Sequence, residues 1–419
     1  MPRLLRNAVR IIACVALSVV VPVLHAATQT VAKPPVTRVE VVRETLHGQS
    51  IEDPYRWLEK KDAPETRAWV DAQNAYTHTV LDPVPGRDRI HARLAQLMKV
   101  DAQGTPLVRG SRYFYTRRLA SQTLSVLYVR EGLEGKERVL IDPHPLSVDH
   151  TTTVSFQDVS DDGRLMAYGT RLGGEDEVSI AFRDVDTGVE LADRMPRARY
   201  FGVSLTADKR GVYYSRHTPE GSRVYFHAMG SDPSGDKLLF GTGYGPEKII
   251  NAALSEDRRW LKITVSHGSS TDRSELYVMD VANGGPVVPV VNDIIAYFSG
   301  RIAGDRMYLQ TNWESSNNRI FLVDLKNPAR DQWKEIIPTG DAVIDDFSLV
   351  GGRLFVNYLK NVVSSVRTFD ADGRPLGTIE FPTLGAVGRL NGRWAQHDAF
   401  FTFTSYHVPT TIYHYDTAT

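Results

Sequence analysis

The sequence predicts an all-β fold, a seven-bladed β-propeller of four-stranded blades, preceded by a short α-helical arm. Three observations support this prediction: a turn motif that occurs seven times, an interval of 40 to 52 residues between its copies, and strand-like segments after each copy. Four short strands in roughly 40–50 residues is the repeat length of a propeller blade. Because one such sheet cannot bury its faces alone, we expect seven sheets to pack around a common axis.

The recurring turn consists of a small or acidic residue, any residue, and then arginine. Its seven copies are Gly110–Arg112, Asp162–Arg164, Asp208–Arg210, Asp257–Arg259, Gly304–Arg306, Gly351–Arg353 and Asn391–Arg393. A charged residue at the entrance of a strand normally faces solvent and discourages edge-to-edge pairing. We therefore interpret these arginines as solvent-exposed residues without a function in binding.

A strand-like run follows each turn. The runs are Tyr113–Thr116, Leu165–Thr170, Gly211–Ser215, Trp260–Val265, Met307–Gln310, Leu354–Tyr358 and, after a short insertion, Ala399–Thr404. The clearest repeat is the fourth, in which Trp260–Val265 alternates apolar and polar residues and Glu275–Met279 follows after a loop. Two such runs joined by a polar loop indicate a β-hairpin.

The first residues have the pattern of a secretory signal peptide. Three arginines precede the 14-residue apolar run Ile11–Leu24, and His25-Ala26-Ala27 offers small residues for cleavage. A lipoprotein cleavage site at Cys14 is the alternative, which the continuing apolar run disfavours. The predicted division is residues 1–27 as signal peptide, 28–99 as tether and helical arm, and 100–419 as the propeller. A periplasmic or secreted protein follows, with no membrane association after cleavage.

Composition excludes several classes of function. The chain has 419 residues, 42% of them hydrophobic and 24% charged, with a net charge of −1 and no basic tract that would indicate nucleic acid binding. Cleavage after residue 27 would leave 46 basic and 50 acidic residues, a net charge of −4, and would remove Cys14, the one cysteine. The mature protein is then expected to have no disulfide, thiol nucleophile or cysteine metal site.

The arm is predicted to hold a polar tether, Thr28–Pro35, and two helices. Asp62 and Glu65 form a capping-box pattern around Pro64. The first helix then presents Trp69, Ala72, Tyr76 and Val80 on one face, and the second presents Ile90, Leu94, Leu97 and Met98. Between tether and helices, the dense apolar anchors of Glu52–Glu59 predict a strap pressed against another surface, with a capped helix start as the alternative.

The segment Asp53-Pro54-Tyr55-Arg56-Trp57-Leu58-Glu59, followed by Trp69-Val70 and Gln73-Asn74, resembles the amino-terminal segment of the prolyl oligopeptidase family of serine peptidases. The resemblance continues through short collinear motifs along the mature chain. These are Tyr113-Phe114-Tyr115, Val126–Val129, Leu140–Pro143, Thr311-Asn312 with Asn318-Arg319, Trp333-Lys334 and Phe403–Tyr406. The resemblance implies the same architecture as the repeats, a seven-bladed propeller after the arm.

In that family an α/β-hydrolase domain follows the propeller and carries a serine on a Gly-x-Ser-x-Gly turn. This sequence ends at Thr419, where the propeller is expected to end, and contains no Gly-x-Ser-x-Gly. A serine nucleophile needs such an exposed turn, a histidine and an oxyanion hole. We therefore predict no catalytic residue in this chain, and the resemblance implies an α/β-hydrolase catalytic domain and short peptides as partners.

Motifs for other chemistry are missing from the sequence. It has no HExxH, no phosphate-binding loop ending in Gly-Lys-Ser/Thr and no EF-hand loop. His144 and His150 flank Pro145 in a loop, and the acidic segment Glu175–Glu177 is better explained as a solvated loop than as a cation site. The sequence therefore predicts no metal ligand and no cofactor.

One residue of a substrate pocket follows from the resemblance. In the family, an aromatic residue shortly before a Trp-Thr-x-Asp-Gly turn lines the substrate cavity. The corresponding position before Thr206-Ala207-Asp208 is Tyr200, although Leu205 stands in place of the tryptophan. Tyr200 is the predicted substrate-binding residue, and an ordinary aromatic at a strand start is the alternative.

Two functions remain open at this point. The first is the propeller region of an exported prolyl-oligopeptidase-like peptidase, which would restrict access to short peptides and be inactive without its catalytic domain. The second is a stand-alone periplasmic propeller that acts as a binding module. The apolar residues of the arm favour the first, since an isolated propeller has no reason to keep an apolar docking surface.

Overall fold

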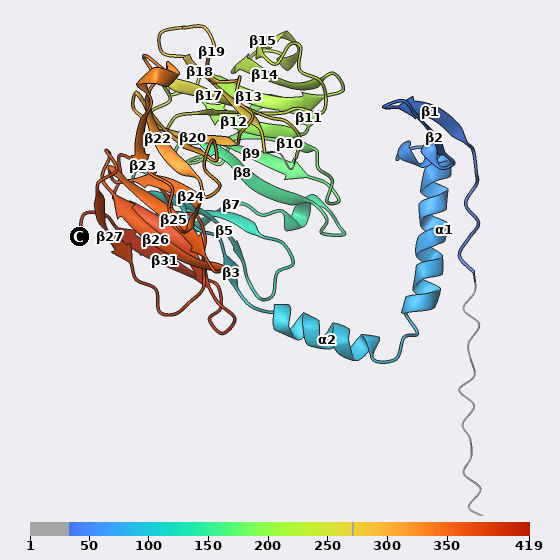
Figure 1. Ribbon diagram of the computed structural model, residues 1–419. Coiled ribbons are helices and arrows are strands. Elements are labelled where there is room, and N and C mark those ends of the chain that lie inside the picture. Colours follow the sequence, from blue (N-terminus) through green and yellow to red (C-terminus); the bar gives the residue numbers. More distant parts are fainter. Residues whose placement is uncertain (1–32, 270–271) are drawn as a thin grey trace, which may run out of the picture. The chain divides into compact units, whose positions relative to one another are not determined.

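The structure is a computed structural model that describes residues 33–269 and 272–419 (Figure 1). The predicted signal peptide lies outside the described residues. The described chain forms two compact units, one that ends at Leu97 and one that begins at Met98. The first contains the helices, and the second consists almost entirely of strands.

The first unit begins with a hairpin that the sequence analysis missed. Strands β1 (Val42–Leu46) and β2 (Gln49–Asp53) pair antiparallel through the two-residue turn His47-Gly48. Both turn residues have positive φ, 52° and 79°, as a type I′ turn requires. The dipeptide His47-Gly48 was the sequence signal for this hairpin, because a glycine preceded by a residue that tolerates positive φ favours a tight turn.

A 3-10 turn and two α-helices follow the hairpin. They are η1 (Arg56–Glu59), α1 (Pro64–Leu81) and α2 (Arg87–Met98), so both predicted helices are present. The predicted capping box is wrong, because the N-cap of α1 is Ala63, which makes no side-chain cap hydrogen bond. Glu65 instead pairs with Arg38 at 2.7 Å. Pro64 does occupy the first turn, where its missing N–H costs nothing.

Two tryptophans fix the extended chain before β1 against the 3-10 turn and α1. The Trp57 indole donates to the carbonyl oxygen of Arg38 at 3.0 Å, and the Trp69 indole donates to the Thr37 hydroxyl at 2.9 Å. The predicted strap therefore packs within its own unit. On α2, by contrast, Ile90, Leu94 and Leu97 are 53–59% exposed, so no described residue of the arm covers this apolar face.

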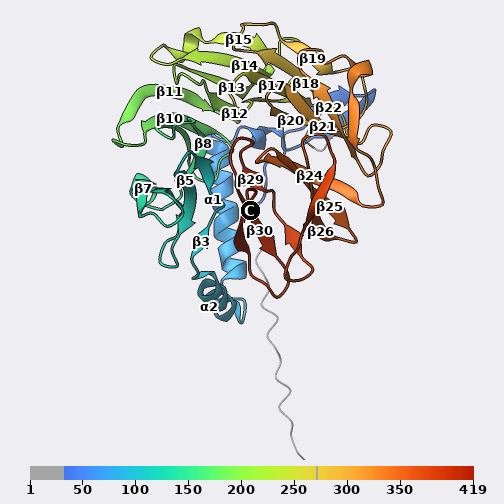
Figure 2. The same ribbon diagram turned by 90° about the vertical axis from the view of Figure 1, so that its left-hand side faces the viewer.

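The second unit is a ring of seven antiparallel sheets, the predicted seven-bladed β-propeller (Figure 2). Each sheet is contiguous in sequence. Blade 1 holds β3 (Ala102–Gln103), β4 (Leu107–Arg109), β5 (Arg112–Arg118), β6 (Val126–Glu131) and β7 (Glu137–Ile141), and blade 2 holds β8 (Thr153–Val159), β9 (Leu165–Arg171), β10 (Val178–Asp184) and β11 (Glu190–Ala198). In blade 1, β3 and β4 both pair with β5 and together form one interrupted inner strand.

The next four blades have the regular four-stranded pattern. Blade 3 holds β12 (Tyr200–Leu205), β13 (Gly211–Thr218), β14 (Gly221–Ala228) and β15 (Lys237–Phe240), and blade 4 holds β16 (Ile249–Leu254), β17 (Trp260–Ser266), β18 (Ser274–Asp280) and β19 (Val288–Val291). Blade 5 holds β20 (Phe298–Ala303), β21 (Arg306–Thr311), β22 (Arg319–Asp324) and β23 (Lys334–Ile337), and blade 6 holds β24 (Val343–Val350), β25 (Arg353–Lys360), β26 (Val363–Phe369) and β27 (Pro375–Ile379).

Blade 7 closes the ring with β28 (Ala386–Val387), β29 (Asn391–Gly392), β30 (Asp398–Thr404) and β31 (Thr411–Asp416). Its inner position is shared by β28 and β29, which pair with the same strand β30. In blades 1 to 6 the recurrent turn connects the inner strand to the second one, and in blade 7 the motif begins within β29. The predicted strand run after each motif is therefore the second strand. Three short 3-10 turns complete the unit: η2 (His144–Leu146), η3 (Pro233–Gly235) and η4 (Arg330–Gln332).

Hydrophobic clusters lie between neighbouring blades. Between blades 4 and 5, for example, Leu276 and Val278 pack with Phe298, Met307 and Leu309, all at 1% exposure or less. Comparable clusters join each adjacent pair from blade 1 to blade 7. Radial packing thus buries both faces of each sheet, which a single blade could not do.

The junction between blades 7 and 1 is smaller and more polar. Its buried apolar members are Val108, Tyr113 and Phe400, with the two rings edge-to-face at 5.9 Å. Asn391 donates to the Thr105 hydroxyl at 2.7 Å across the same junction. No strand is shared between the first and last blades in the described chain, so side chains alone close the ring.

Candidate functional site

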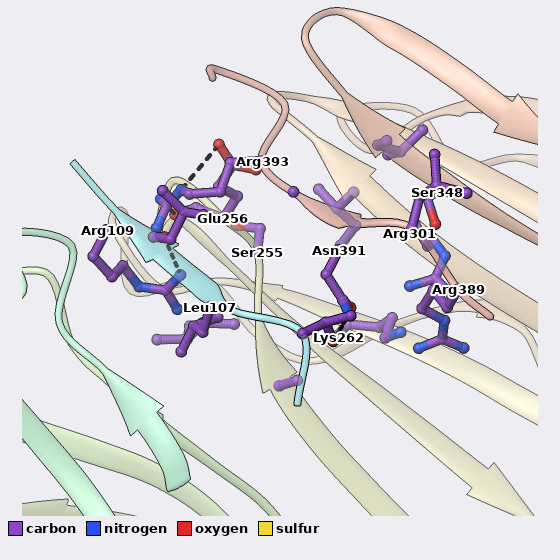
Figure 3. Close-up of a pocket in the computed structure, with 18 of the residues that line it drawn as sticks. Leu107, Arg109, Ser255, Glu256, Lys262, Arg301, Ser348, Arg389, Asn391 and Arg393 are labelled. Atoms are coloured by element: carbon purple, nitrogen blue, oxygen red, sulfur yellow. Dashed lines mark hydrogen bonds and ion pairs between the residues drawn. The ribbon is translucent and has the colours of Figure 1, made fainter. Parts of the chain in front are cut away.

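The axis of the propeller contains two cavities that share a wall. The first, here called the axial cavity, has a volume of about 440 Å³ and is lined by inner strands and turns of blades 1, 4, 5, 6 and 7 and by Lys262 of the second strand of blade 4 (Figure 3). The second cavity, of about 630 Å³, is lined by blades 1, 2, 3, 4 and 7. Leu107, Ala253 and Gly392 belong to both. Pockets of this size accommodate small molecules or a few peptide residues.

A group of ion pairs borders both cavities at the end of the inner strands where the recurrent turns lie. We call it the braced cluster; its members are Arg109, Asp158, Asp161, Glu256, Arg258 and Arg393. Three cations face three carboxylates. The members come from blades 1, 2, 4 and 7, so the cluster connects blades that are not neighbours in the ring.

Arg258 lies at the centre of the braced cluster. Its guanidinium donates to both oxygens of Asp158, at 2.6 and 3.2 Å, and to the carbonyl oxygens of Leu205 and Val159. The two side chains are only 7% and 10% exposed. Arg258 is the fourth residue of the turn that begins at Ser255, and its backbone has a φ of 60°, in the left-handed region. The strained position directs a blade 4 side chain toward blade 2.

Glu256 connects blade 4 to blade 7, as Arg258 connects blade 4 to blade 2. Its carboxylate accepts hydrogen bonds from the backbone N–H groups of Trp394, at 2.6 Å, and Ala395, at 3.1 Å. The Arg393 guanidinium lies 3.4 Å from the same carboxylate and donates to Asp161 at 2.9 Å. Figure 3 shows Glu256 and Arg393 in contact on one side of the axial cavity.

The pKa shifts in this cluster differ between its two buried arginines. Burial opposes the positive charge of Arg258, but the carboxylates of Asp158 and Asp161 outweigh it and raise the pKa of Arg258 above its ordinary value. Burial lowers the pKa of Arg109 to about 10, although Asp158 partly compensates. Both guanidinium groups therefore remain charged near neutral pH.

A second charged group lies on the opposite side of the axial cavity. We call it the cationic cluster; it consists of Lys262, Arg301 and Arg389 together with Asp346. Arg301 and Arg389 share the Asp346 carboxylate, at 2.9 and 2.6 Å, and their labelled side chains lie side by side in Figure 3. The Lys262 ammonium donates to the carbonyl oxygen of Gly300 at 2.6 Å, and no carboxylate of the described residues lies within 4.0 Å of it.

The environment of the cationic cluster disfavours its positive charges. Burial, with added repulsion from Arg301 and Arg389, lowers the pKa of Lys262 to about 8. Burial also lowers the pKa of Arg301, against the attraction of Asp346. The Asp346 pKa is lowered as well, because the two guanidinium charges outweigh the effect of burial on the carboxylate. Asp346 thus pairs with two of the three cations, and among the described residues Lys262 has only the Gly300 carbonyl oxygen.

The structure places Tyr200, the predicted substrate-binding residue, at the start of β12 in the wall of the second cavity. Its ring packs on Tyr214 with centroids 6.0 Å apart, and its hydroxyl donates to the carbonyl oxygen of Pro196. Burial raises the pKa of this phenol, which therefore stays neutral. Phe201 lines the same cavity, so the wall is aromatic at this point.

Serine and histidine come together twice in the described part of the chain, without the geometry of a nucleophile. His217 lies 3.3 Å from Ser222, but that serine is fully buried and donates to the Lys248 carbonyl oxygen. Ser405 lies 3.4 Å from His407 in an exposed turn. No carboxylate in the described ranges pairs with either histidine, so neither pair has the third group that orients a catalytic base.

One histidine, His227, is buried between two carboxylates at the junction of blades 2 and 3. His227 is inaccessible and lies between Asp236, at 2.7 Å, and Asp193, at 3.2 Å.

Within residues 33–269 and 272–419, no group of three or more histidine, cysteine, aspartate or glutamate residues has the arrangement of a metal site. Over those residues, no helix combines the length and the hydrophobicity needed to cross a membrane.

The interpretation of the turn arginines as solvent-exposed residues is wrong for several of them. Arg112 is 20% exposed and binds Asp186 of blade 2 at 2.7 Å. Arg259 binds Asp305 of blade 5 at 2.6 Å, and Arg393 belongs to the braced cluster. The spacing along the chain identifies the turns. Which carboxylates their arginines contact depends on how the blades pack in the ring. Arg164, by contrast, is 66% exposed as expected.

Comparisons with known proteins agree with this architecture. Residues 34–419 match the family described as prolyl oligopeptidase, N-terminal beta-propeller domain. The chain is 29% identical to a prolyl endopeptidase of Elizabethkingia meningoseptica over 94% of its own length and 57% of the relative's, and 25% identical to dipeptidyl aminopeptidase BI of Pseudoxanthomonas mexicana over 95% and 58%.

A solved structure from a study of two prolyl endopeptidases superimposes with a TM-score of 0.85 and 33% identity, over 92% of this chain and 58% of that one. The seven sheets and the matched residues define a β-propeller of the prolyl oligopeptidase type. The chain belongs to the prolyl oligopeptidase family and corresponds to its N-terminal propeller region. It spans somewhat more than half the length of the relatives it matches.

Proposed function

We propose that this chain is the substrate-admitting propeller region of an exported prolyl-oligopeptidase-like serine peptidase. The observation that carries the proposal is the match of residues 34–419 to the family's propeller, over 57% of the length of a prolyl endopeptidase. Peptide hydrolysis then requires an α/β-hydrolase domain as partner. The chain by itself binds short peptides weakly and cleaves none.

The geometry of the axis supports admission of short peptides. The axial and second cavities together offer a narrow, partly aromatic space between rigid inner strands, which excludes a folded protein. The braced cluster joins blades 2, 4 and 7 and thereby limits how far the inner strands separate. Tyr200 is the proposed contact for a substrate side chain, because a neutral aromatic wall suits an uncharged residue such as proline.

The arm supports the proposed partner. Ile90, Leu94 and Leu97 lie on one face of α2 and are exposed, and Tyr55 is 44% exposed. Burial of each such side chain would contribute roughly 1.5–3 kcal/mol. A catalytic domain that covers this face should protect it, whereas without that domain limited proteolysis should remove residues up to about Met98 first. An arm as resistant as the blades in a monomeric sample would favour the stand-alone binding module instead.

The proposal that the protein is exported rests on the signal-peptide pattern of residues 1–27. Cell fractionation and the intact mass of the protein test it directly: we expect the mature protein outside the cytoplasm with Thr28 as its first residue. Retention of the full mass in the cytoplasmic fraction would contradict export and leave the peptide-binding proposal unaffected.

The peptide-binding proposal is tested with a variant that fills the shared wall of the two cavities. Ala253→Trp should weaken binding of a fluorescent proline-containing octapeptide at least about tenfold, because the indole occupies the space that the peptide needs. Ala282→Trp, at an exposed turn of the same blade, is the matched control and should bind like the wild type. Equal binding by both variants would exclude the axis as the peptide site.

A further inference from the structure

We propose that the cationic cluster of Lys262, Arg301, Arg389 and Asp346 is a binding site for a carboxylate, and that the carboxylate is the C-terminus of a short peptide. The oxyanion site itself stands on the geometry of this chain. Its assignment to a peptide rests on the proposed function. The chemistry is shared with inorganic phosphate, which serves as the alternative source.

The first argument is the charge balance around the axial cavity. The braced cluster pairs three cations with three carboxylates, whereas the cationic cluster has three cations for Asp346 alone. Charges removed from water are normally paired or hydrogen-bonded, because the cost of leaving them uncompensated is several kcal/mol per ion. In the cationic cluster this applies to the partly buried Lys262 and Arg301, since Arg389 is 55% exposed. An anion in the cavity would supply the negative charge that Asp346 alone does not.

The second argument is the number of free donors. An ammonium has three N–H donors and a guanidinium has five. Lys262 uses one donor on the Gly300 carbonyl oxygen. Arg301 uses a terminal nitrogen on Asp346, while its buried Nε has no partner. Arg389 uses its Nε on Asp346 and keeps a 55% exposed side chain. Donors therefore remain on all three cations.

The third argument is access. Lys262, Arg301 and Arg389 all line the axial cavity, so a ligand can reach them without rearrangement of the strands. Asp346 does not line the cavity; it lies behind the two arginines and holds them in place. Lys262 has a pKa of about 8 and is mostly protonated at neutral pH, and a bound anion would favour that charged form.

The position of the second cavity favours a peptide as the source of the carboxylate. It shares the wall of Leu107, Ala253 and Gly392 with the axial cavity and is lined by Tyr200 and Phe201. A short peptide whose terminal carboxylate meets the cationic cluster can extend its apolar residues along this wall. The site would then select peptides with a free C-terminus over internal segments of a longer chain.

The test is a calorimetric titration of the purified protein in a chloride buffer with three probes. They are an N-acetylated, proline-containing tetrapeptide as the free acid, the same peptide as the C-terminal amide, and inorganic phosphate. We expect the acid to bind about tenfold more tightly than the amide, as charge-assisted hydrogen bonds imply, and phosphate to compete with the acid. Lys262→Met should make the acid and the amide equal.

Two further variants keep the result interpretable. Arg389→Gln changes an exposed side chain and should also reduce the preference for the acid, even if Lys262→Met fails to fold. Lys334→Met removes a lysine from the exposed edge strand of blade 5 and should leave the preference unchanged.

The outcomes separate this inference from the proposed function. If both peptides bind equally and phosphate does not bind, the carboxylate site is overturned while the peptide-admitting propeller stands. If phosphate binds but neither peptide displaces it, the peptide assignment is overturned. If neither peptide binds at all, the proposed function fails. Phosphate binding that is lost in Lys262→Met, weakened in Arg389→Gln and unchanged in Lys334→Met would still uphold the oxyanion site.

Discussion

The braced cluster and the cationic cluster lie on opposite sides of one cavity and contain three cations each, yet they differ in every other respect. Arg109, Arg258 and Arg393 meet three carboxylates and several backbone groups. Arg301 and Arg389 share one carboxylate, whereas Lys262 contacts none of the described carboxylates. The first group has satisfied its charges within the protein and joins distant blades. The second retains unpaired charge where a ligand can enter, which distinguishes a candidate binding site from a structural one.

The largest expected effect comes from removal of a carboxylate from the braced cluster. Asp158→Asn keeps the shape of the side chain but leaves Arg258 and Arg109 without their common counter-charge. We expect a loss of about 3–5 kcal/mol in the free energy of unfolding, the usual effect of breaking a buried ion pair. Urea denaturation measures it, with Asp176→Asn, at an exposed pair with Arg199, as a control expected to change by less than about 1 kcal/mol. A similar small loss for Asp158→Asn would remove the distinction between the clusters.

Removal of a cation from the cationic cluster should have the opposite sign. Lys262→Met eliminates an uncompensated charge, and we expect the free energy of unfolding to increase by about 1–2 kcal/mol at pH 7 in a buffer without phosphate. A loss of stability equal to that of Asp158→Asn would show that Lys262 is paired after all. Lys334→Met controls for the change in net charge.

The pH dependence of the same variant sharpens this comparison. The pKa of Lys262 is about 8 in the folded protein, against 10.5 for an ordinary lysine, so the unfolded chain binds more protons between these two values. Stability attributable to this group therefore rises from about pH 8 to pH 10.5 in the wild type, and the variant lacks that rise. The advantage of Lys262→Met should shrink across this window in parallel urea titrations. A constant difference between the two proteins would contradict the lowered pKa.

A smaller effect is expected from the aromatic wall of the second cavity. Tyr200→Ala removes an aromatic contact of the second cavity and should weaken binding of the proline-containing tetrapeptide about fivefold, or about 1 kcal/mol. Tyr200→Phe keeps the ring and loses only the hydroxyl that donates to Pro196, so it should bind nearly as the wild type. The preference for free acid over amide should survive both substitutions, since neither touches the cationic cluster.

The sequence predicted the blades because each of them repeats a local pattern: the turn at Asp257–Arg259 and the alternating run after it are readable without the fold. It did not predict either cluster. Lys262 looked like the polar residue of an alternating strand, and Arg258 looked like part of a solvated turn. Only the ring geometry brings Arg258 to Asp158, 100 positions earlier in the chain, and Lys262 beside Arg301. Tyr200 was found through the family resemblance rather than through any periodicity.

Under the proposed function, the charged and aromatic residues of the axis bind peptides without cleaving them. Incubation of the purified protein with the N-acetylated proline-containing tetrapeptide, followed by mass spectrometry and a parallel binding measurement, tests this claim most directly. The account predicts that the peptide is bound and recovered intact, because no serine of the described chain lies beside a histidine oriented by a carboxylate. Cleavage that survives further purification and disappears when a serine of this chain is mutated would contradict it.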